Sequence, residues 1–208
     1  SLLDAISFDC FYVGQADAKE LCHALRGRLA DHTACHPAPP LEKDFVKSAK
    51  ETRRHEEELP VSQGQLLLAY RTGIRLDGDG FYALAVMNEL LGLSPVSKLF
   101  VNVRERLSLC YFCSSHYNAY KGILTVHCGL DPKNRALAEA EIHSQVDAVK
   151  QGEFSDWELD AAKKSLKNAY RQLQDSPVAL ENFYFGRTLM GVCTTAEECR
   201  AAFDAVTR

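Results

Sequence analysis

The chain has 208 residues, of which 46% are apolar and 25% charged, and a formal net charge of −4. These values are ordinary for a globular protein with a sizeable core, whereas nucleic-acid binding needs a clustered basic surface. No apolar run approaches the roughly 18 residues of a membrane span, and the first residues lack the layout of a signal peptide. We therefore expect a cytoplasmic protein with no nucleic-acid partner and no membrane partner.

The eight cysteines are scattered through the chain. A chain of this length and apolar content needs no disulfides for stability. Cys110 and Cys113 form a C-x-x-C pair, but they lie in a strand pattern, where residues i and i+3 point to opposite faces. No second C-x-x-C completes a zinc site. We interpret the cysteines as buried structural thiols, with a redox or metal pair at Cys110 and Cys113 as the alternative.

The N-terminal part predicts a short strand at Ser7–Val13 and then a helix that ends at Leu29. Gln15 or Asp17 would begin the helix. Its apolar face would be formed by Leu21, Leu25 and Leu29.

A proline-rich irregular connection follows at residues 31–40. His32, Cys35 and His36 lie close together in it, but three such residues without a fourth make a weak metal site, so an ordinary loop is favoured. The charged segment 42–58, which includes an RRHEEE run, is typical of a solvated edge.

Residues 63–72 (QGQLLLAYRT) predict a strand that is apolar on both faces and therefore central in a covered sheet. Residues 77–80 form a turn and an N-cap. A helix is then expected over Phe81–Leu91, closed by Gly92.

The stretch 94–120 changes its period from that of a helix to that of a strand. Ser94 and Pro95 suit the N-cap and the first helical position. The expected buried helical face is Val96, Leu99, Phe100, Val103 and Leu107. After Ser108 the period is two. One strand face would hold Cys110, Phe112, Ser114 and His116, and the other Tyr111, Cys113, Ser115 and Tyr117.

The remaining sequence predicts a two-residue turn at Lys121–Gly122 and a return strand over Gly122–Leu130. Further helices are expected at 131–151, 155–173, 176–191 and from 195 to the last residue. This order of elements favours an α+β fold, in which a layer of helices packs on one face of a mixed or antiparallel sheet.

The histidines form no recognisable catalytic motif. The sequence contains neither H-E-x-x-H nor H-x-x-E-H, no G-x-S-x-G and no phosphate-binding glycine loop. His55 precedes three glutamates but lacks a second histidine, so charged surface is favoured. His116 and His127 lie on neighbouring expected strands and could face each other, yet no carboxylate partner is evident. The sequence alone therefore shows no complete set of catalytic residues.

Arg104 and Tyr111 stand seven residues apart across the helix-to-strand junction. A guanidinium can grip a carbonyl or carboxylate, and a phenol can donate one hydrogen bond to a substrate or an oxyanion. In the alternative interpretation, Arg104 caps its own helix and Tyr111 is a half-buried sheet residue. Chemistry alone favours that second interpretation.

The order of elements and several motifs resemble the pitrilysin/insulinase family of zinc peptidases, the inverzincins. Residues 103–111 (VRERLSLCY) are similar to the L-R-E-x-x-x-L-x-Y pattern of that family's second domain, with the Arg-to-Tyr spacing intact. Further similar segments are Phe11–Gly14, Gln63–Tyr70, Leu90–Phe100 and Glu153–Lys164. The resemblance covers nearly the whole chain.

The family is built from homologous α+β domains, usually paired. The first carries the H-x-x-E-H zinc site, and the second lacks it and closes over the substrate. The resemblance implies that Arg104 and Tyr111 bind the peptide substrate near the scissile bond, and that this segment holds no catalytic residue and no metal. The zinc would lie in a partner domain or subunit.

The resemblance further implies that residues 1–208 are a single C-terminal-type domain, a fragment of a longer two-domain chain similar to the small bacterial members. Its function would be that of the non-catalytic, substrate-binding half of a zinc-dependent endopeptidase, inactive alone and paired with a zinc-bearing N-terminal domain or a homologous subunit as a heterodimer. The alternative is a purely structural half of an inactive homologue that stabilises an active partner.

Overall fold

The computed structural model describes residues 10–30 and 47–208. The chain divides into two compact units, and each is described by itself. The described residues of the first unit are 10–30 and 173–186, and those of the second are 47–172 and 187–208. None of the helices formed by these described residues is both long enough and apolar enough to cross a membrane.

The first unit contains α1 (Ala18–Leu29) and the start of α5 (Pro177–Met190). The Asp17 carboxylate accepts hydrogen bonds from the backbone N–H groups of Lys19 (2.8 Å) and Glu20 (3.1 Å), which caps α1 as predicted. The predicted face of this helix is half-buried at Leu21, Leu25 and Leu29. The strand predicted nearby is not seen at residues 10–13, and its residues 7–9 lie outside the described part.

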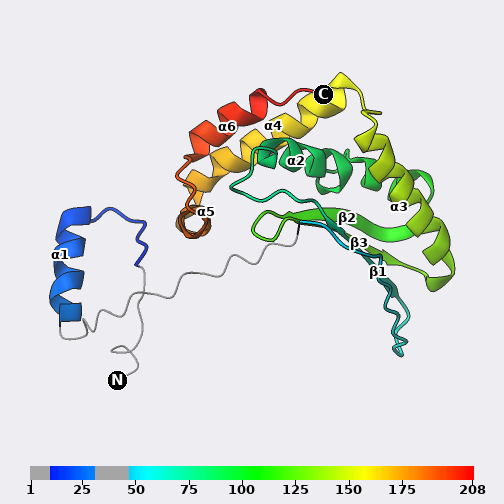
Figure 1. The fold of residues 1–208 in the computed structure, drawn as a ribbon, viewed down its shortest axis with the longest axis horizontal. Coiled ribbons are helices and arrows are strands. Elements are labelled where there is room, and N and C mark those ends of the chain that lie inside the picture. The colour runs from blue at the N-terminus through cyan, green and yellow to red at the C-terminus, as the bar shows by residue number, and fades with distance from the viewer. Residues whose placement is uncertain (1–9, 31–46) are drawn as a thin grey trace. The chain divides into compact units, whose positions relative to one another are not determined.

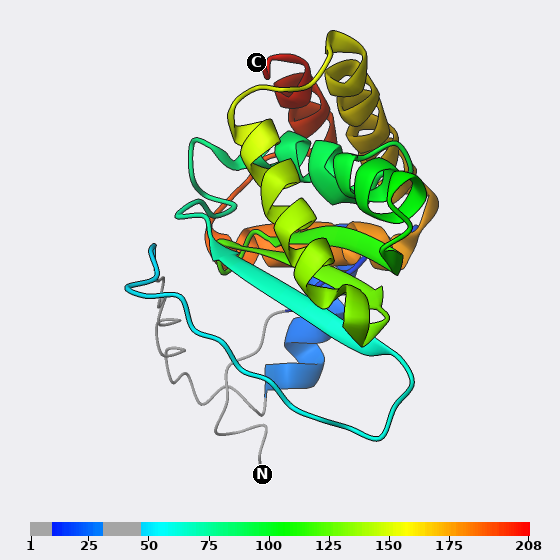
Figure 2. The same cartoon turned by 90° about the vertical axis from the view of Figure 1, so that its right-hand side faces the viewer.

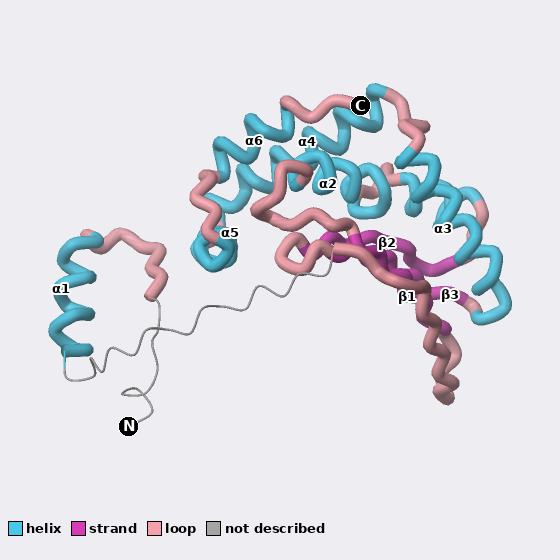
Figure 3. Tube along the Cα trace, in the orientation of Figure 1, coloured by secondary structure: helices cyan, strands magenta, loops and turns pink. Residues whose placement is uncertain are grey.

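The second unit is built on an antiparallel sheet, with the order β1-β3-β2 among the described strands. The strands are β1 (Gly64–Arg71), β2 (Cys110–Asn118) and β3 (Ile123–Leu130). In Figure 1 the helices α2 (Phe81–Asn88), α3 (Arg135–Lys150), α4 (Asp156–Gln172) and α6 (Ala196–Asp204) lie on one side of these strands. Figures 2 and 3 show the same layering. The predicted α+β fold with one helix layer is confirmed.

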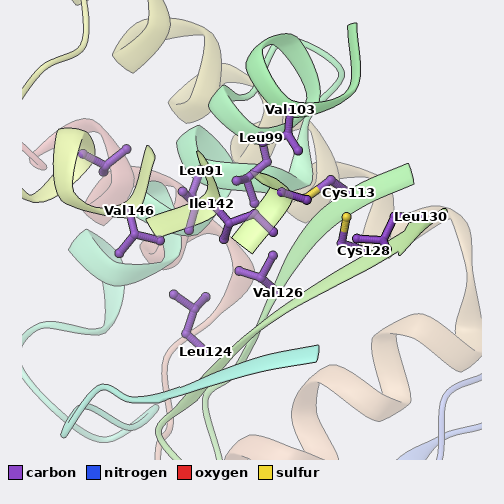
Figure 4. Packing of buried hydrophobic residues seen from close by; sticks show 12 residues of the cluster. Leu91, Leu99, Val103, Cys113, Leu124, Val126, Cys128, Leu130, Ile142 and Val146 are labelled. Carbon is purple, nitrogen blue, oxygen red and sulfur yellow. The ribbon is translucent and has the colours of Figure 1, made fainter. Parts of the chain in front are cut away.

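The core lies between the helix layer and the inner face of the sheet. Figure 4 shows Leu91, Leu99 and Ile142 on the helical side, directed toward Val126 on β3. The fully buried members of this cluster are Leu91, Leu99, Val103, Val126, Cys128, Ala138 and Ile142. Removing this apolar surface from water supplies the main free energy that holds the two layers together.

Short helical turns extend or separate the longer helices. Two are π-helical, η3 (Glu89–Leu93) and η4 (Leu99–Arg106), and two are 3-10 turns, η5 (Pro132–Asn134) and η6 (Leu173–Asp175). The helix predicted from Phe81 is therefore confirmed, and it continues through Gly92 as η3.

The later helices begin where their capping residues predict. The N–H of Ser155 donates to the Glu158 carboxylate (2.7 Å), and the N–H of Glu158 donates to Ser155 Oγ (3.2 Å), so a capping box precedes α4 where the helix from residue 155 was expected. Within α4, Leu159, Ala162 and Leu166 are buried, whereas Ala169 is exposed.

The hairpin between β2 and β3 is confirmed, but its turn is longer than predicted. Asn118 pairs with Ile123, so the loop has the four residues 119–122. The N–H of Lys121 donates to Asn118 Oδ1 (3.1 Å), and Gly122 has a φ of +59°. Because glycine adopts this left-handed conformation at no steric cost, it closes the loop.

The prediction that residues 63–72 form a central strand covered on both faces is wrong. β1 is an edge strand of the described sheet, and its residues alternate between half-buried and exposed. Leu66 and Leu68 pack against the core, whereas Leu67 is 58% exposed. An apolar run shows that both faces of a strand are hydrophobic, but it does not show that both are covered. The central strand is β3, which is less uniformly apolar.

A close backbone contact fixes the helix layer on the sheet. A Cβ placed on Gly92 would lie 2.6 Å from the backbone nitrogen of Ser115 and 2.7 Å from a methyl of Leu99. Ser115 Oγ, which is buried, donates to the Asn88 side chain (2.8 Å) and lies 3.1 Å from the Asn88 carbonyl. Gly92 is thus required for the close approach of η3 to β2, and it is not a helix terminator as the sequence indicated.

We expect Gly92→Ala to lower the free energy of unfolding by about 1–3 kcal/mol, because the atom that its methyl would meet is backbone and cannot rotate away. Denaturant unfolding followed by circular dichroism measures the change. The matched control is Gly64→Ala, whose Cβ would meet its nearest neighbours at 3.4 Å. Equal effects of the two substitutions would contradict the requirement for close approach at Gly92.

Candidate functional site

The helical segment that leads to the junction is η4, a π-helix. The N–H of Leu107 donates to the carbonyl of Asn102 (3.2 Å), an i to i−5 bond. Leu99 and Val103 are fully buried in the core. Asn102 Nδ2 donates to Gln145 Oε1 on α3 (2.8 Å), so both apolar and polar contacts hold this segment in place.

The predicted start and buried face of this helix are partly wrong. Ser94 does not cap a helix: its carbonyl accepts from the N–H of Ser97 in a turn, and η4 begins at Leu99. Val96 is 44% exposed and Leu107 is 41% exposed. A π-helix has wider turns than the 3.6-residue helix on which the prediction was based, so Leu107 no longer falls on the face of Leu99 and Val103.

The chain reverses from helix to strand at Ser108, whose φ of +49° is the one positive value among the described non-glycine residues. The N–H of Leu109 donates to the carbonyl of Val103 (3.1 Å), and Asn134 Nδ2 donates to the carbonyl of Leu109 (3.3 Å). Backbone and side-chain hydrogen bonds therefore fix the junction at both of its sides.

Tyr111 is the extra residue of a β-bulge. Cys110 pairs with Leu130 and Phe112 pairs with Gly129, so Tyr111 has no partner residue on β3. Its side chain is 60% exposed, and its hydroxyl makes no hydrogen bond with any residue that the structure describes. Tyr111, Cys113 and Ser115 were predicted to share one face of this strand, but Cys113 and Ser115 are buried whereas Tyr111 is exposed.

Arg104 lies on η4 and is also accessible. Its side chain is 41% exposed, its guanidinium carbon lies 4.7 Å above the centre of the Phe100 ring, and its Nε is 3.6 Å from the carboxylate of Glu105. In the described part of the chain it makes no hydrogen bond to a helix carbonyl. The alternative interpretation of the pair is therefore wrong in both of its parts. Arg104 does not cap its own helix, and Tyr111 is exposed rather than half-buried.

The structure brings Arg104 and Tyr111 to one junction, since η4 packs on β2, but in the described part of the chain no hydrogen bond or ion pair joins them. A second cation, Lys133, lies near Tyr111. The hydrogen bond with Asp131 (2.8 Å) raises the pKa of Lys133, and Tyr111 adds a smaller upward contribution. The junction thus offers a guanidinium and a phenol as hydrogen-bond donors, which suits the binding of a carbonyl or carboxylate oxygen.

The histidine candidates do not form a site. His116 and His127 share the outer face of the sheet and are exposed, but His127 is opposite Ser114 and His116 is opposite Thr125, so they are not a facing pair.

The other candidate residues do not form a site either. His55 is exposed, as expected for charged surface. His32, Cys35 and His36 lie outside the described residues. Among residues 10–30 and 47–208, no group of three or more histidine, cysteine, aspartate or glutamate side chains is arranged to hold a metal ion.

The cysteine interpretation needs two corrections. Cys10, Cys22 and Cys193 are exposed and are therefore not buried structural thiols. Cys110 and Cys113 do not point to opposite faces, because the bulge inserts one residue between them, and both side chains pack into the core. A regular period of two could not reveal this, since a bulge leaves no simple sequence signal.

Comparisons with known proteins identify the family of the chain. Residues 6–166 match the family model described as "Peptidase M16 inactive domain". The chain therefore belongs to the peptidase M16 family, in its inactive-domain branch, which confirms the resemblance to the pitrilysin/insulinase peptidases.

Individual relatives support the same assignment. The chain is 29% identical over 208 residues to the probable inactive metalloprotease YmfF of Bacillus subtilis, which is 100% of this chain and 48% of that protein. It is 30% identical over 131 residues to the uncharacterized zinc protease YmxG of the same organism, covering 62% of this chain and 31% of that one. A conserved protein from Enterococcus faecalis V583, with a solved structure, superposes with a TM-score of 0.74 at 33% identity, covering 78% and 39% of the two chains.

The chain thus spans about half or less of the length of these relatives. One of these relatives, YmxG, is named a zinc protease. The sequence of this chain contains no H-x-x-E-H motif, and no group of side chains among residues 10–30 and 47–208 is arranged to hold a metal ion.

The junction itself can be tested at Ser108. We expect Ser108→Val to lower the free energy of unfolding by about 1–3 kcal/mol, since a β-branched residue is strained at positive φ. Ser108→Gly relieves that strain, and we expect it to be neutral or to stabilise by up to about 1 kcal/mol. Thermal or urea unfolding of both variants measures this, and equal destabilisation by glycine and valine would contradict the left-handed conformation.

Proposed function

We propose that this chain is the non-catalytic, substrate-binding half of a zinc-dependent endopeptidase of the pitrilysin/insulinase family. Arg104 and Tyr111 bind the peptide backbone at a hydrolysis site that another domain or subunit carries. The observation that most supports this is the exposure of Tyr111 at the bulge, with a hydroxyl that forms no hydrogen bond in the described structure.

The chemistry of the pair suits this role. A peptide carbonyl that is attacked at its carbon gains negative charge on its oxygen, and donors already in place stabilise that charge. The Tyr111 hydroxyl and the Arg104 guanidinium are such donors, and the cation of Lys133 favours negative charge nearby. The surrounding hydrogen bonds at Asn102 and Leu109 hold both segments in place before substrate arrives.

The partner is inferred from what this chain lacks. It contains no H-x-x-E-H motif, so the metal, the attacking water and the general base come from elsewhere. The relatives are about twice as long as this chain or longer, which supports a single domain paired with a zinc-bearing N-terminal domain or with a homologous subunit in a heterodimer. The free cysteines of the described residues support a reducing, cytoplasmic setting.

A second candidate is a purely structural half that stabilises an active partner. It is favoured by one finding, the 29% identity over the whole chain to a protein named a probable inactive metalloprotease. The two candidates differ in whether Arg104 and Tyr111 contribute to peptide turnover.

We expect Tyr111→Phe, in the assembled full-length protein with its zinc-bearing partner, to lower kcat by about 10²-fold, the usual effect of losing one donor to a developing oxyanion. Arg104→Ala should lower kcat/KM by about tenfold or more, because it removes a charged hydrogen-bond donor. Cleavage of a quenched-fluorescent peptide mixture measures both, and circular dichroism and the elution volume of the complex report folding and assembly.

The matched controls are Arg106→Ala on the same helix and Tyr120→Phe in the hairpin loop, both of which are exposed. They should leave turnover unchanged. If Arg104→Ala and Tyr111→Phe match these controls in an active complex, the substrate-binding role fails and the structural role is favoured.

A further inference from the structure

Three cysteines meet at the end of the sheet that carries the bulge. Cys113 on β2 is directly opposite Cys128 on β3, and these two residues are 4% and 0% exposed. Figure 4 shows their side chains on neighbouring strands, within the core. Cys110 begins β2 and is partly exposed.

The bulge is the reason that Cys110 joins this pair. In a regular strand, the residue two before Cys113 would share its face, and that residue is Tyr111. Because the bulge leaves Tyr111 unpaired, Cys110 takes the inner position instead, and it packs against the core. Cys110, Cys113 and Cys128 therefore lie on the same face of the two neighbouring strands and pack into the core. We name these three residues the thiol triad.

We propose that the thiol triad is a peroxide-responsive oxidation site, in which Cys110 reacts first and a Cys113–Cys128 disulfide is the end product. This site is independent of the peptide-binding role, since it needs neither Arg104 nor Tyr111 to contact a substrate.

The reaction consumes one hydroperoxide. The Cys110 thiolate attacks an oxygen of hydrogen peroxide, the O–O bond breaks, and a sulfenic acid and one water result. The Cys128 thiol attacks the Cys110 sulfur and expels the second oxygen as water, which forms a Cys110–Cys128 disulfide. Cys113 then attacks the Cys128 sulfur and returns Cys110 as a thiolate. In total, two thiols lose two electrons and two protons, and one peroxide becomes two waters.

The electrostatics assign the first step to Cys110. Hydrogen bonds from Cys113 and then from Cys128 lower the pKa of Cys110, burial opposes this, and the Arg104 guanidinium lowers it further. The same contacts with Cys110, together with burial, raise the pKa values of Cys113 and Cys128. Thiolates are the reactive form, so the partly exposed Cys110 is the nucleophile and its two buried neighbours are the resolving thiols.

The strand register assigns the final disulfide. Residues directly opposite in an antiparallel pair have Cα atoms about 4.5–5.5 Å apart, and a disulfide spans Cα distances of roughly 4.4–6.8 Å. Cys113 and Cys128 can therefore be joined with little backbone movement. Cys110 is opposite Leu130 and is only a diagonal neighbour of Cys128, so a bond between them is the less favourable one and serves as an intermediate.

The test treats the full-length protein with one equivalent of hydrogen peroxide, blocks free thiols in acid, and maps disulfides by mass spectrometry. We expect the Cys113–Cys128 peptide pair as the main product. Cys110→Ser should slow its formation at least tenfold, whereas Cys193→Ser, at an exposed cysteine, should not change the rate. Cys128→Ser should instead accumulate a sulfenic acid at Cys110, trapped by a dimedone probe, or a Cys110–Cys113 disulfide.

A second measurement needs no variant. Under limiting iodoacetamide at neutral pH, Cys110 of the unmodified protein should be alkylated faster than the more exposed Cys193, because its neighbouring thiols and the Arg104 guanidinium lower the pKa of Cys110. The proposal is overturned if Cys110→Ser forms the disulfide at the unmodified rate, if peroxide leaves Cys113 and Cys128 reduced while it oxidises the exposed cysteines, or if Cys193 is alkylated first.

Discussion

The backbone contact between Gly92 and Ser115 is the constraint on which the arrangement of the second unit depends. It places η3 against β2 at a separation that no side chain on Gly92 would allow, and the buried hydrogen bond from Ser115 to Asn88 holds it there. Since η4 follows η3 after a short turn, this contact also sets where Leu99 and Val103 enter the core. The position of Arg104 on η4 therefore depends on the contact between Gly92 and Ser115, which is made earlier in the chain by η3.

The bulge at Tyr111 produces two separate chemical features, an exposed phenol and a cluster of three thiols. One inserted residue moves Tyr111 out of the sheet face, where its phenol is exposed, and moves Cys110 into the core beside Cys113 and Cys128. Bulges commonly re-aim side chains next to functional sites. The donor pair and the thiol triad are thus two results of the same local change in register, and neither would exist in a regular strand with this sequence.

Local signals in the sequence predicted the parts of the fold that local chemistry determines. The caps at Asp17 and Ser155 mark helix starts because their hydrogen bonds involve residues two or three positions away. The exposure of Leu67 could not be predicted, because it depends on what covers the outer face of the sheet. The π-helical turn that exposes Leu107 and the bulge at Tyr111 are likewise set by tertiary packing. The spacing of Arg104 and Tyr111 drew attention to this junction, but only the family resemblance suggested a function for it.

The exposure of Tyr111 bears on why a tyrosine stands there. A tyrosine kept for stability is normally buried along most of its ring, with its hydroxyl bonded, as for Tyr117, which donates to the carbonyl of Ile74 (3.0 Å) and whose pKa burial raises to about 12. Tyr111 has neither feature, so the stability of this chain alone gives little reason to place an aromatic ring and a phenol at the bulge. An exposed hydrogen-bond donor contributes to stability only when another molecule covers it, because the side chain is then buried and its hydrogen bond is formed at the same time. A partner surface or a peptide backbone meets that condition, and the adjacent guanidinium of Arg104 favours an occupant that presents oxygen atoms.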